Sequence, residues 1–123
     1  DKRFKAICLN DNLPGMMAIA NDISYDEIFV EQIKNFVQPN DLAICFSGSG
    51  NSLNVLKAIE HAKQVGATTV AFYGYNGGKV KSMVDLALHA EIDDMEISED
   101  IHLLIAHCIK QIVMKRLGLQ IGV

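Results

Sequence analysis

The fold is decided by residues 42–52, Leu-Ala-Ile-Cys-Phe-Ser-Gly-Ser-Gly-Asn-Ser. The first five are apolar and uninterrupted, which is typical of a strand covered on both faces of a parallel sheet. From Ser52 to Val65 apolar residues recur at helical spacing, and Gly66 follows where a helix C-cap is expected. The stretch therefore predicts a buried strand, a glycine-rich turn and an amphipathic helix.

The same alternation continues on both sides of this stretch. Before it, the sequence predicts a strand at Phe4–Leu9, a turn-rich loop at Asn10–Gly15 and a helix at Ser24–Val37 that Pro39 stops. After it, we expect strands at Thr68–Tyr73 and Leu86–Ala90, one helical turn at Val80–Val84, and a long helix at about Ser98–Leu117. Alternating strands and helices indicate an α/β fold, a three-layer α/β/α sandwich with a parallel sheet.

Length and composition set the class of protein. The chain has 123 residues, 50% of them hydrophobic, and a net charge of −4, which predicts one domain over residues 1–123. The negative charge disfavours nucleic acid and anionic membranes as partners, and no stretch reaches the roughly 20 apolar residues of a membrane span. Three widely spaced cysteines argue against a disulfide framework, so we expect a reducing, cytoplasmic location.

The loop Ser47-Gly48-Ser49-Gly50-Asn51-Ser52 has the chemistry of a phosphate site. Its glycines let the backbone approach a ligand, the N–H groups of the following helix attract anions, and the hydroxyls and the amide add donors. A purely structural interpretation, in which these residues cap the helix and turn the chain, stays open. The loop lacks the Gly-Lys ending of a P-loop and the third glycine of a dinucleotide site, so no nucleotide cofactor is expected.

Several stretches together resemble a known family. The loop is followed by Asn54-Val-Leu-Lys-Ala-Ile59, preceded by Asn21-Asp22 and Tyr25, and joined by Gly74-Tyr-Asn-Gly-Gly-Lys79 and residues 99–107, Glu-Asp-Ile-His-Leu-Leu-Ile-Ala-His. The pattern is similar to the sugar isomerase (SIS) domain family, and within it to the phosphoheptose isomerases. Members of that family begin with N-terminal helices and a first strand–loop–helix unit, to which nothing in these 123 residues corresponds.

The resemblance implies roles for individual residues. Ser47, Gly48, Ser49, Asn51 and Ser52 would hold the substrate phosphate. The sugar hydroxyls would contact two acidic residues, Asp22 and Glu96.

The resemblance also implies that His107 is the catalytic acid and base of an aldose–ketose isomerisation. From the sequence alone a single helical histidine is more often structural. The family's partner base is a glutamate on an early helix, which this chain lacks. Some members hold Zn²⁺, for which Glu99 and His107 would be ligands here, although a zinc site needs four ligands. His102, between them, is interpreted as a surface or packed residue.

The resemblance predicts an isomerase that converts sedoheptulose 7-phosphate to a heptose 7-phosphate for bacterial surface polysaccharide synthesis. It also implies a homo-oligomer, either a tetramer or a dimer of dimers, and the apolar stripe of the last helix suits a core or an interface equally. The alternative is a non-catalytic SIS module, either a sugar-phosphate sensor or an adaptor of the kind that associates with the bacterial replication initiator. His107 favours the enzyme, because a module that only binds needs no proton-transfer residue.

Overall fold

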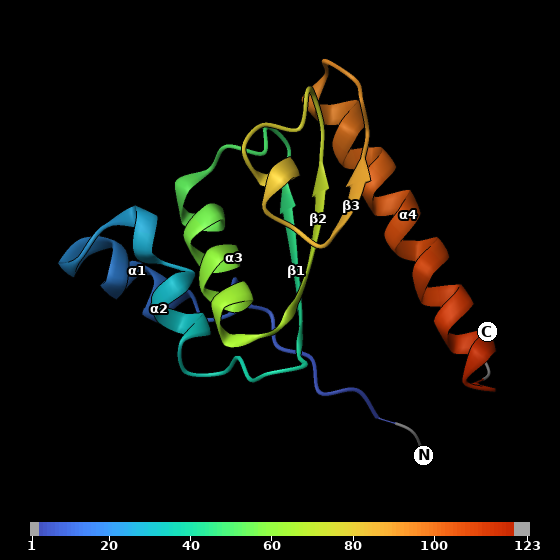
Figure 1. The fold of residues 1–123 in the computed structure, drawn as a ribbon. Helices are drawn as coiled ribbons and strands as arrows, with labels where there is room; N and C mark the ends of the chain where they lie inside the picture. The colour runs from blue at the N-terminus through green and yellow to red at the C-terminus, as the bar shows by residue number, and fades with distance from the viewer. Residues whose placement is uncertain (1–2, 120–123) are drawn as a thin grey trace.

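Three parallel strands form the sheet of the protein, for which the computed structural model describes residues 3–119 (Figure 1). The strands are β1 (Leu42–Ser47), β2 (Thr68–Tyr73) and β3 (Leu86–His89), which lie in that order across the sheet. Leu42 pairs with Thr68 in the register of β1 and β2, and Val70 pairs with Leu86 in that of β2 and β3. The strands expected from residue 42 onward are therefore confirmed, and their carboxyl ends lie at one edge.

Two helices cover the two faces of this sheet, so the three-layer α/β/α architecture is confirmed (Figure 1). One face packs against α3 (Leu53–Val65), which buries Ile59 and Ala62 and ends at Gly66 in the left-handed conformation, with φ +94°. The other face packs against α4 (Met95–Arg116), which begins at its N-cap Asp94. Within residues 3–119 no helix combines the length and the apolar character needed to span a membrane.

The chain before β1 forms an outer layer beyond α3, and it differs from the sequence prediction (Figure 1). The expected helix over Ser24–Val37 is wrong as a continuous element, because it is divided into the 3₁₀ turn η1 (Tyr25–Glu27) and the short helix α2 (Val30–Ile33). The Asn35 side chain donates to the Glu31 carbonyl, and the Asn35 N–H bonds the nearer Gln32 carbonyl instead. Amide side chains that compete for backbone acceptors in this way shorten helices.

Sequence analysis missed the helix α1 (Leu13–Asp22), whose first turn it took for a loop. Asn12 is the N-cap, and its side-chain oxygen accepts a hydrogen bond from the N–H of Gly15 at 3.2 Å. Pro14 lies in the first turn, where its missing N–H costs nothing. An asparagine followed closely by a proline marks a helix start as well as a turn, and here it marks the start.

The strand expected at Phe4–Leu9 is absent, and the prediction is wrong for this structure. The segment pairs with no strand of the three-stranded sheet, and the side chains of Phe4 and Ile7 are exposed. A strand exists only when a neighbour accepts and donates its backbone hydrogen bonds. Apolar residues with β propensity are therefore not sufficient to form one.

Asp85 fixes the start of β3 against β2. Its carboxylate oxygen Oδ2 accepts hydrogen bonds from the N–H and the hydroxyl of Thr69, both at 2.8 Å, and Lys63 of α3 lies 3.2 Å from Oδ1. The Thr69 backbone bond, then its hydroxyl bond and the bond from Lys63, lower the pKa of Asp85 from its ordinary value of 3.8 to about 2. The three residues join both strands to the helix that connects β1 to β2.

Asp85→Asn is expected to lower the free energy of unfolding at pH 7. Because the folded pKa lies below the unfolded one, the stabilisation from Asp85 is complete above about pH 4 and is lost as the pH falls toward 2. Urea unfolding at several pH values measures the difference between the two proteins, which should shrink over that range. The exposed Asp93 provides the control, Asp93→Asn. A difference between wild type and Asp85→Asn that stays constant from pH 7 to pH 2 would contradict this assignment.

Candidate functional site

The loop singled out in the sequence lies at the carboxyl end of β1, where ligands bind in open α/β sheets. It turns back at Gly50, whose φ is +67° and whose N–H donates to the carbonyl of Ser47 at 3.0 Å. The chain then enters α3 at its N-cap, Ser52. The Ser52 side chain makes no capping hydrogen bond, but the N–H of Val55, in the first turn, donates to Oδ1 of Asn54 at 2.8 Å.

The turn that follows β2 holds this loop in place. Gly74 donates its N–H to the Gly48 carbonyl at 2.7 Å, and Val80 donates to the Gly50 carbonyl at 3.0 Å. The Asn51 side chain completes the connection. Its Nδ2 donates to the Ser49 carbonyl, and its Oδ1 accepts from the N–H of Lys79 at 3.1 Å. Asn51 therefore stabilises the shape of the loop from within.

Two glycines, Gly50 and Gly78, are required because side chains there would collide with backbone atoms. A Cβ at Gly50 would lie 2.1 Å from the carbonyl oxygen of Gly77, and one at Gly78 would lie 2.5 Å from that of Ser49. A Cβ at Gly48 would lie 2.1 Å from the sulfur of Met95, at the start of α4. Sequence analysis did not identify Met95, whose contact with Gly48 exists only in the folded chain.

The hydroxyl groups of the loop differ in the hydrogen bonds that they make within the protein. The Ser49 hydroxyl accepts a weak bond from the N–H of Asn51 at 3.3 Å. The Ser47 side chain is only 6% exposed, and its Oγ makes no hydrogen bond within the described residues. Since buried hydroxyls are nearly always bonded, an unpaired Ser47 Oγ beside a helix N-terminus is a group prepared for a ligand.

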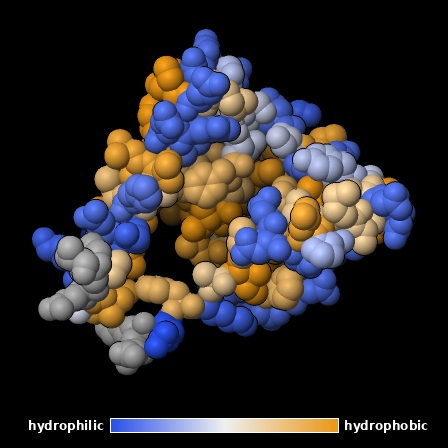
Figure 2. Space-filling model, turned by 180° about the vertical axis from the view of Figure 1, so that it is seen from behind, coloured by the Kyte–Doolittle hydropathy of each residue, from blue (hydrophilic) through white to orange (hydrophobic). Residues whose placement is uncertain are grey.

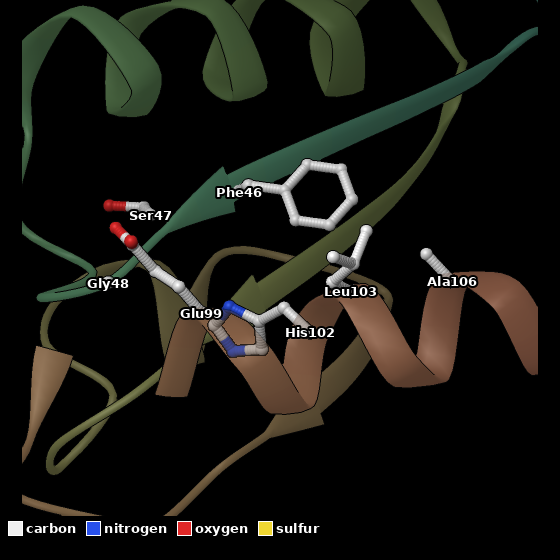
Figure 3. Close-up of a pocket in the computed structure, with 7 residues that line it drawn as sticks. All are labelled: Phe46, Ser47, Gly48, Glu99, His102, Leu103 and Ala106. Carbon is white, nitrogen blue, oxygen red and sulfur yellow. The ribbon is translucent and has the colours of Figure 1, made fainter. Parts of the chain in front are cut away.

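A pocket of about 280 Å³ opens beside the loop (Figure 3). One wall is the end of β1, Phe46–Gly48, and the other is α4, which contributes Glu99, His102, Leu103 and Ala106. Glu99 extends from α4 toward the end of β1 (Figure 3). Figure 2 shows a hollow with a mostly apolar surface on the back of the molecule. The loop and α4 therefore form a cleft with polar groups at one end.

His102 is a member of this pocket that sequence analysis left as a surface or packed residue. It is 4% exposed and lies edge-on to Phe72, with ring centroids 5.8 Å apart. Its Nε2 is buried without a hydrogen-bond partner in the described chain. The spacing of Glu99 and His102, three residues apart on a helix, was a signal that both face one side.

The other residues implicated by the resemblance lie outside this pocket. Asp22 is exposed at the end of α1, where its carboxylate accepts a hydrogen bond from Asn21. Glu96 is exposed in the first turn of α4, and His107 is exposed further along the same helix. The structure therefore brings Glu99 to the phosphate loop but does not bring Asp22, Glu96 or His107 to the lining of the pocket.

The residues expected to bind zinc do not form a metal site by themselves. Nowhere in the described part of the chain do three or more His, Cys, Asp or Glu side chains gather as metal ligands. Glu99 lines the pocket and His107 does not, and they lie about 12 Å apart along the helix axis. The donor set of residues 3–119 therefore does not fit Zn²⁺ by itself.

Comparison with known proteins finds a family whose matching region includes the loop. Residues 4–74 match the SIS domain family. Over 108 residues the chain is 39% identical to a probable phosphoheptose isomerase of Thermoplasma acidophilum, an alignment that covers 88% of this chain and 59% of the relative. Over 106 residues it is 42% identical to a phosphoheptose isomerase of Helicobacter pylori, with 86% of this chain and 55% of the relative covered.

Two solved structures have the same fold. The phosphoheptose isomerase of Neisseria gonorrhoeae superposes with a TM-score of 0.87 at 26% identity, covering 89% of this chain and 61% of that one. A phosphoheptose isomerase from Francisella tularensis gives 0.85 at 26% identity, covering 91% and 64%. The chain thus spans between about half and two thirds of the length of each of these proteins.

Gly50→Ala is expected to lower the free energy of unfolding by about 2–4 kcal/mol, because left-handed strain adds to the collision with Gly77. Gly118→Ala is the matched control, since Gly118 has a φ of +66° and no atom near its absent Cβ. The control should lose no more than about 1–2 kcal/mol. Chemical denaturation measures both, and equal losses would show that the approach of Gly77 does not constrain the loop.

Proposed function

Since the chain belongs to the SIS domain family, we propose that its protein is a phosphoheptose isomerase. The reaction would convert sedoheptulose 7-phosphate to a heptose 7-phosphate for bacterial surface polysaccharide synthesis. The names of the relatives from Thermoplasma and Helicobacter support this reaction. The observation that carries the proposal is the buried, unpaired hydroxyl of Ser47 in a glycine loop at a helix N-terminus.

The phosphate is proposed to bind in the bend of the loop. Backbone N–H groups at the start of α3 and the hydroxyls of Ser47, Ser49 and Ser52 donate to its oxygens. Gly48 allows the ligand to approach the backbone, and Asn51 holds the bend open through its bonds to Ser49 and Lys79. Such a site neutralises the phosphate with dipoles and needs no lysine, which suits a protein with a net charge of −4.

The isomerisation moves one proton between two neighbouring carbons. A base removes a proton from C1 of the ketose while the carbonyl oxygen at C2 gains one, and an enediol forms. Return of a proton to C2, with loss of the proton on the C1 oxygen, gives the aldose. His107 is proposed to transfer protons in these steps, because an imidazole titrates near neutral pH. Asp22 and Glu96 are proposed to accept hydrogen bonds from sugar hydroxyls.

Zinc binding is a separate part of the proposal. Glu99 and His107 would act as two of the ligands only together with groups outside the described residues, because these two donors do not complete a site. The activity with and without a chelator measures whether zinc contributes to the reaction. The proposed proton transfer by His107 does not depend on zinc.

A homo-oligomer, as a tetramer or a dimer of dimers, is proposed from the surface of α4. Leu104 and Ile112, two members of the apolar stripe noted in the sequence, are 62% and 53% exposed. Water contact with such a stripe is unfavourable, and a second copy would remove it. A cytoplasmic location belongs to the same proposal and is supported by Cys8, Cys45 and Cys108, which are all unpaired.

Ser52→Ala tests the phosphate site. Ser52 makes no capping bond, so the substitution should leave the thermal midpoint nearly unchanged. The loss of one hydrogen bond to the phosphate should raise the KM for sedoheptulose 7-phosphate about tenfold. Steady-state kinetics and thermal denaturation of the same samples separate the two effects. An unchanged KM would remove Ser52 from the phosphate site.

His107→Gln tests the proton transfer. The substitution keeps a polar side chain of similar size but no group that titrates near neutrality, so kcat should fall about 10²–10⁴-fold. The assay uses the full-length natural protein with sedoheptulose 7-phosphate, with and without chelator. His61→Gln, on α3 and outside the pocket, is the control and should leave kcat unchanged.

The outcomes distinguish the proposal from its rival. Wild-type activity in His107→Gln would exclude that residue from the mechanism. Tight binding of sugar phosphates by the wild-type protein, without turnover of any of them, would contradict the isomerase and favour a sugar-phosphate sensor.

A further inference from the structure

Two residues that line the pocket beside the loop each carry a buried polar atom without a partner in the described chain, Ser47 Oγ and His102 Nε2. The two residues come from elements far apart in the sequence, β1 and α4, and line the same cavity of about 280 Å³. Leaving a buried polar group without a partner is unfavourable. Two such groups in one cavity indicate that something other than residues 3–119 bonds them.

Burying the His102 imidazole with an unpaired nitrogen is energetically unfavourable if the side chain serves only for packing. Its ring lies 5.8 Å from that of Phe72 and 6.4 Å from that of Phe46, and those two rings stack at 4.5 Å. A third apolar ring would fill this corner without burying a nitrogen. The position is therefore better explained by a hydrogen bond between the imidazole and a ligand in the cavity.

The cavity has two chemically different parts. At the end of β1 it meets Ser47 and Gly48 of the phosphate loop, where an anion is favoured. The carboxylate of Glu99 extends from α4 toward this same end and accepts hydrogen bonds (Figure 3), while His102, Leu103 and Ala106 line the rest of the α4 wall. The ligand portion that suits the α4 part is uncharged, donates hydrogen bonds and carries C–H groups.

We propose that the imidazole of His102 binds a hydroxyl group on the carbon chain of the phosphorylated sugar, while the phosphate lies on the loop. One hydroxyl can donate to Glu99 and accept from His102, or the reverse. The C–H groups of the chain pack on Phe46 and Leu103. The proposal rests on the proposed function for the identity of the ligand, and it adds a binding residue to that site.

The test compares two ligands and two substitutions in the full-length natural protein. His102→Phe keeps an aromatic ring and removes the hydrogen bond, and His102→Gln keeps an amide that can form one. The KM for sedoheptulose 7-phosphate should rise about tenfold in His102→Phe and recover in part in His102→Gln. The inhibition constant of inorganic phosphate, which reaches only the loop, should stay within about twofold of wild type.

A matched control is His61→Phe on α3, which should change neither constant, because His61 does not line the pocket. Equal weakening of sugar phosphate and inorganic phosphate in His102→Phe would overturn the proposal and assign His102 to packing. An unchanged KM in a folded His102→Phe would overturn it as well.

A second measurement needs no substitution and no turnover. In protein labelled with ¹⁵N at histidine, the imidazole nitrogen resonances of His102 should shift when sedoheptulose 7-phosphate is added and should stay in place with inorganic phosphate. The absence of a shift with bound sugar phosphate would overturn the proposal even where His102→Phe fails to fold. Loss of sugar-phosphate binding altogether, with inorganic phosphate still bound, would instead contradict the proposed function.

Discussion

The close approach of two loops is the constraint on which the rest of the structure depends. The loop after β1 and the turn after β2 lie side by side because their strands are parallel neighbours, and backbone hydrogen bonds join Gly48 to Gly74 and Gly50 to Val80. Such contact between two backbones leaves no room for side chains, and the glycines supply that room. The bend of the loop after β1 is therefore held by both loops, and its shape depends on the pairing of β1 with β2.

Sequence alone predicted the elements whose partners are close along the chain. The strands β1 and β2 and the helix α3 follow one another, so their hydrophobic patterns reflect the contacts that they make. Phe4–Leu9 has an equally apolar pattern and forms no strand, because a strand depends on a neighbour that its own residues do not specify. Likewise, helical spacing in Ser24–Val37 did not reveal that the Asn35 side chain occupies a carbonyl needed for the helix.

For the candidate site, too, the sequence predicted only the part that is encoded by residues close together in the chain. The glycine- and serine-rich loop is encoded in consecutive residues, and the structure places Ser47 and Ser52 at the end of a strand and the start of a helix. His102 was not predictable as part of the pocket, because its burial depends on rings from β1 and β2 that no local pattern connects to it. The roles of Asp22, Glu96 and His107 rest on the family resemblance, and no contact within residues 3–119 brings them to the pocket.

The contact between Gly48 and Met95 has a consequence for how this family can vary. A Cβ at position 48 and the thioether at position 95 would occupy the same volume, so a side chain in the loop requires the flexible and partly exposed Met95 side chain to turn away. The two positions are therefore expected to be coupled, and an exchange of loops between relatives would also change the packing of the first turn of the last helix.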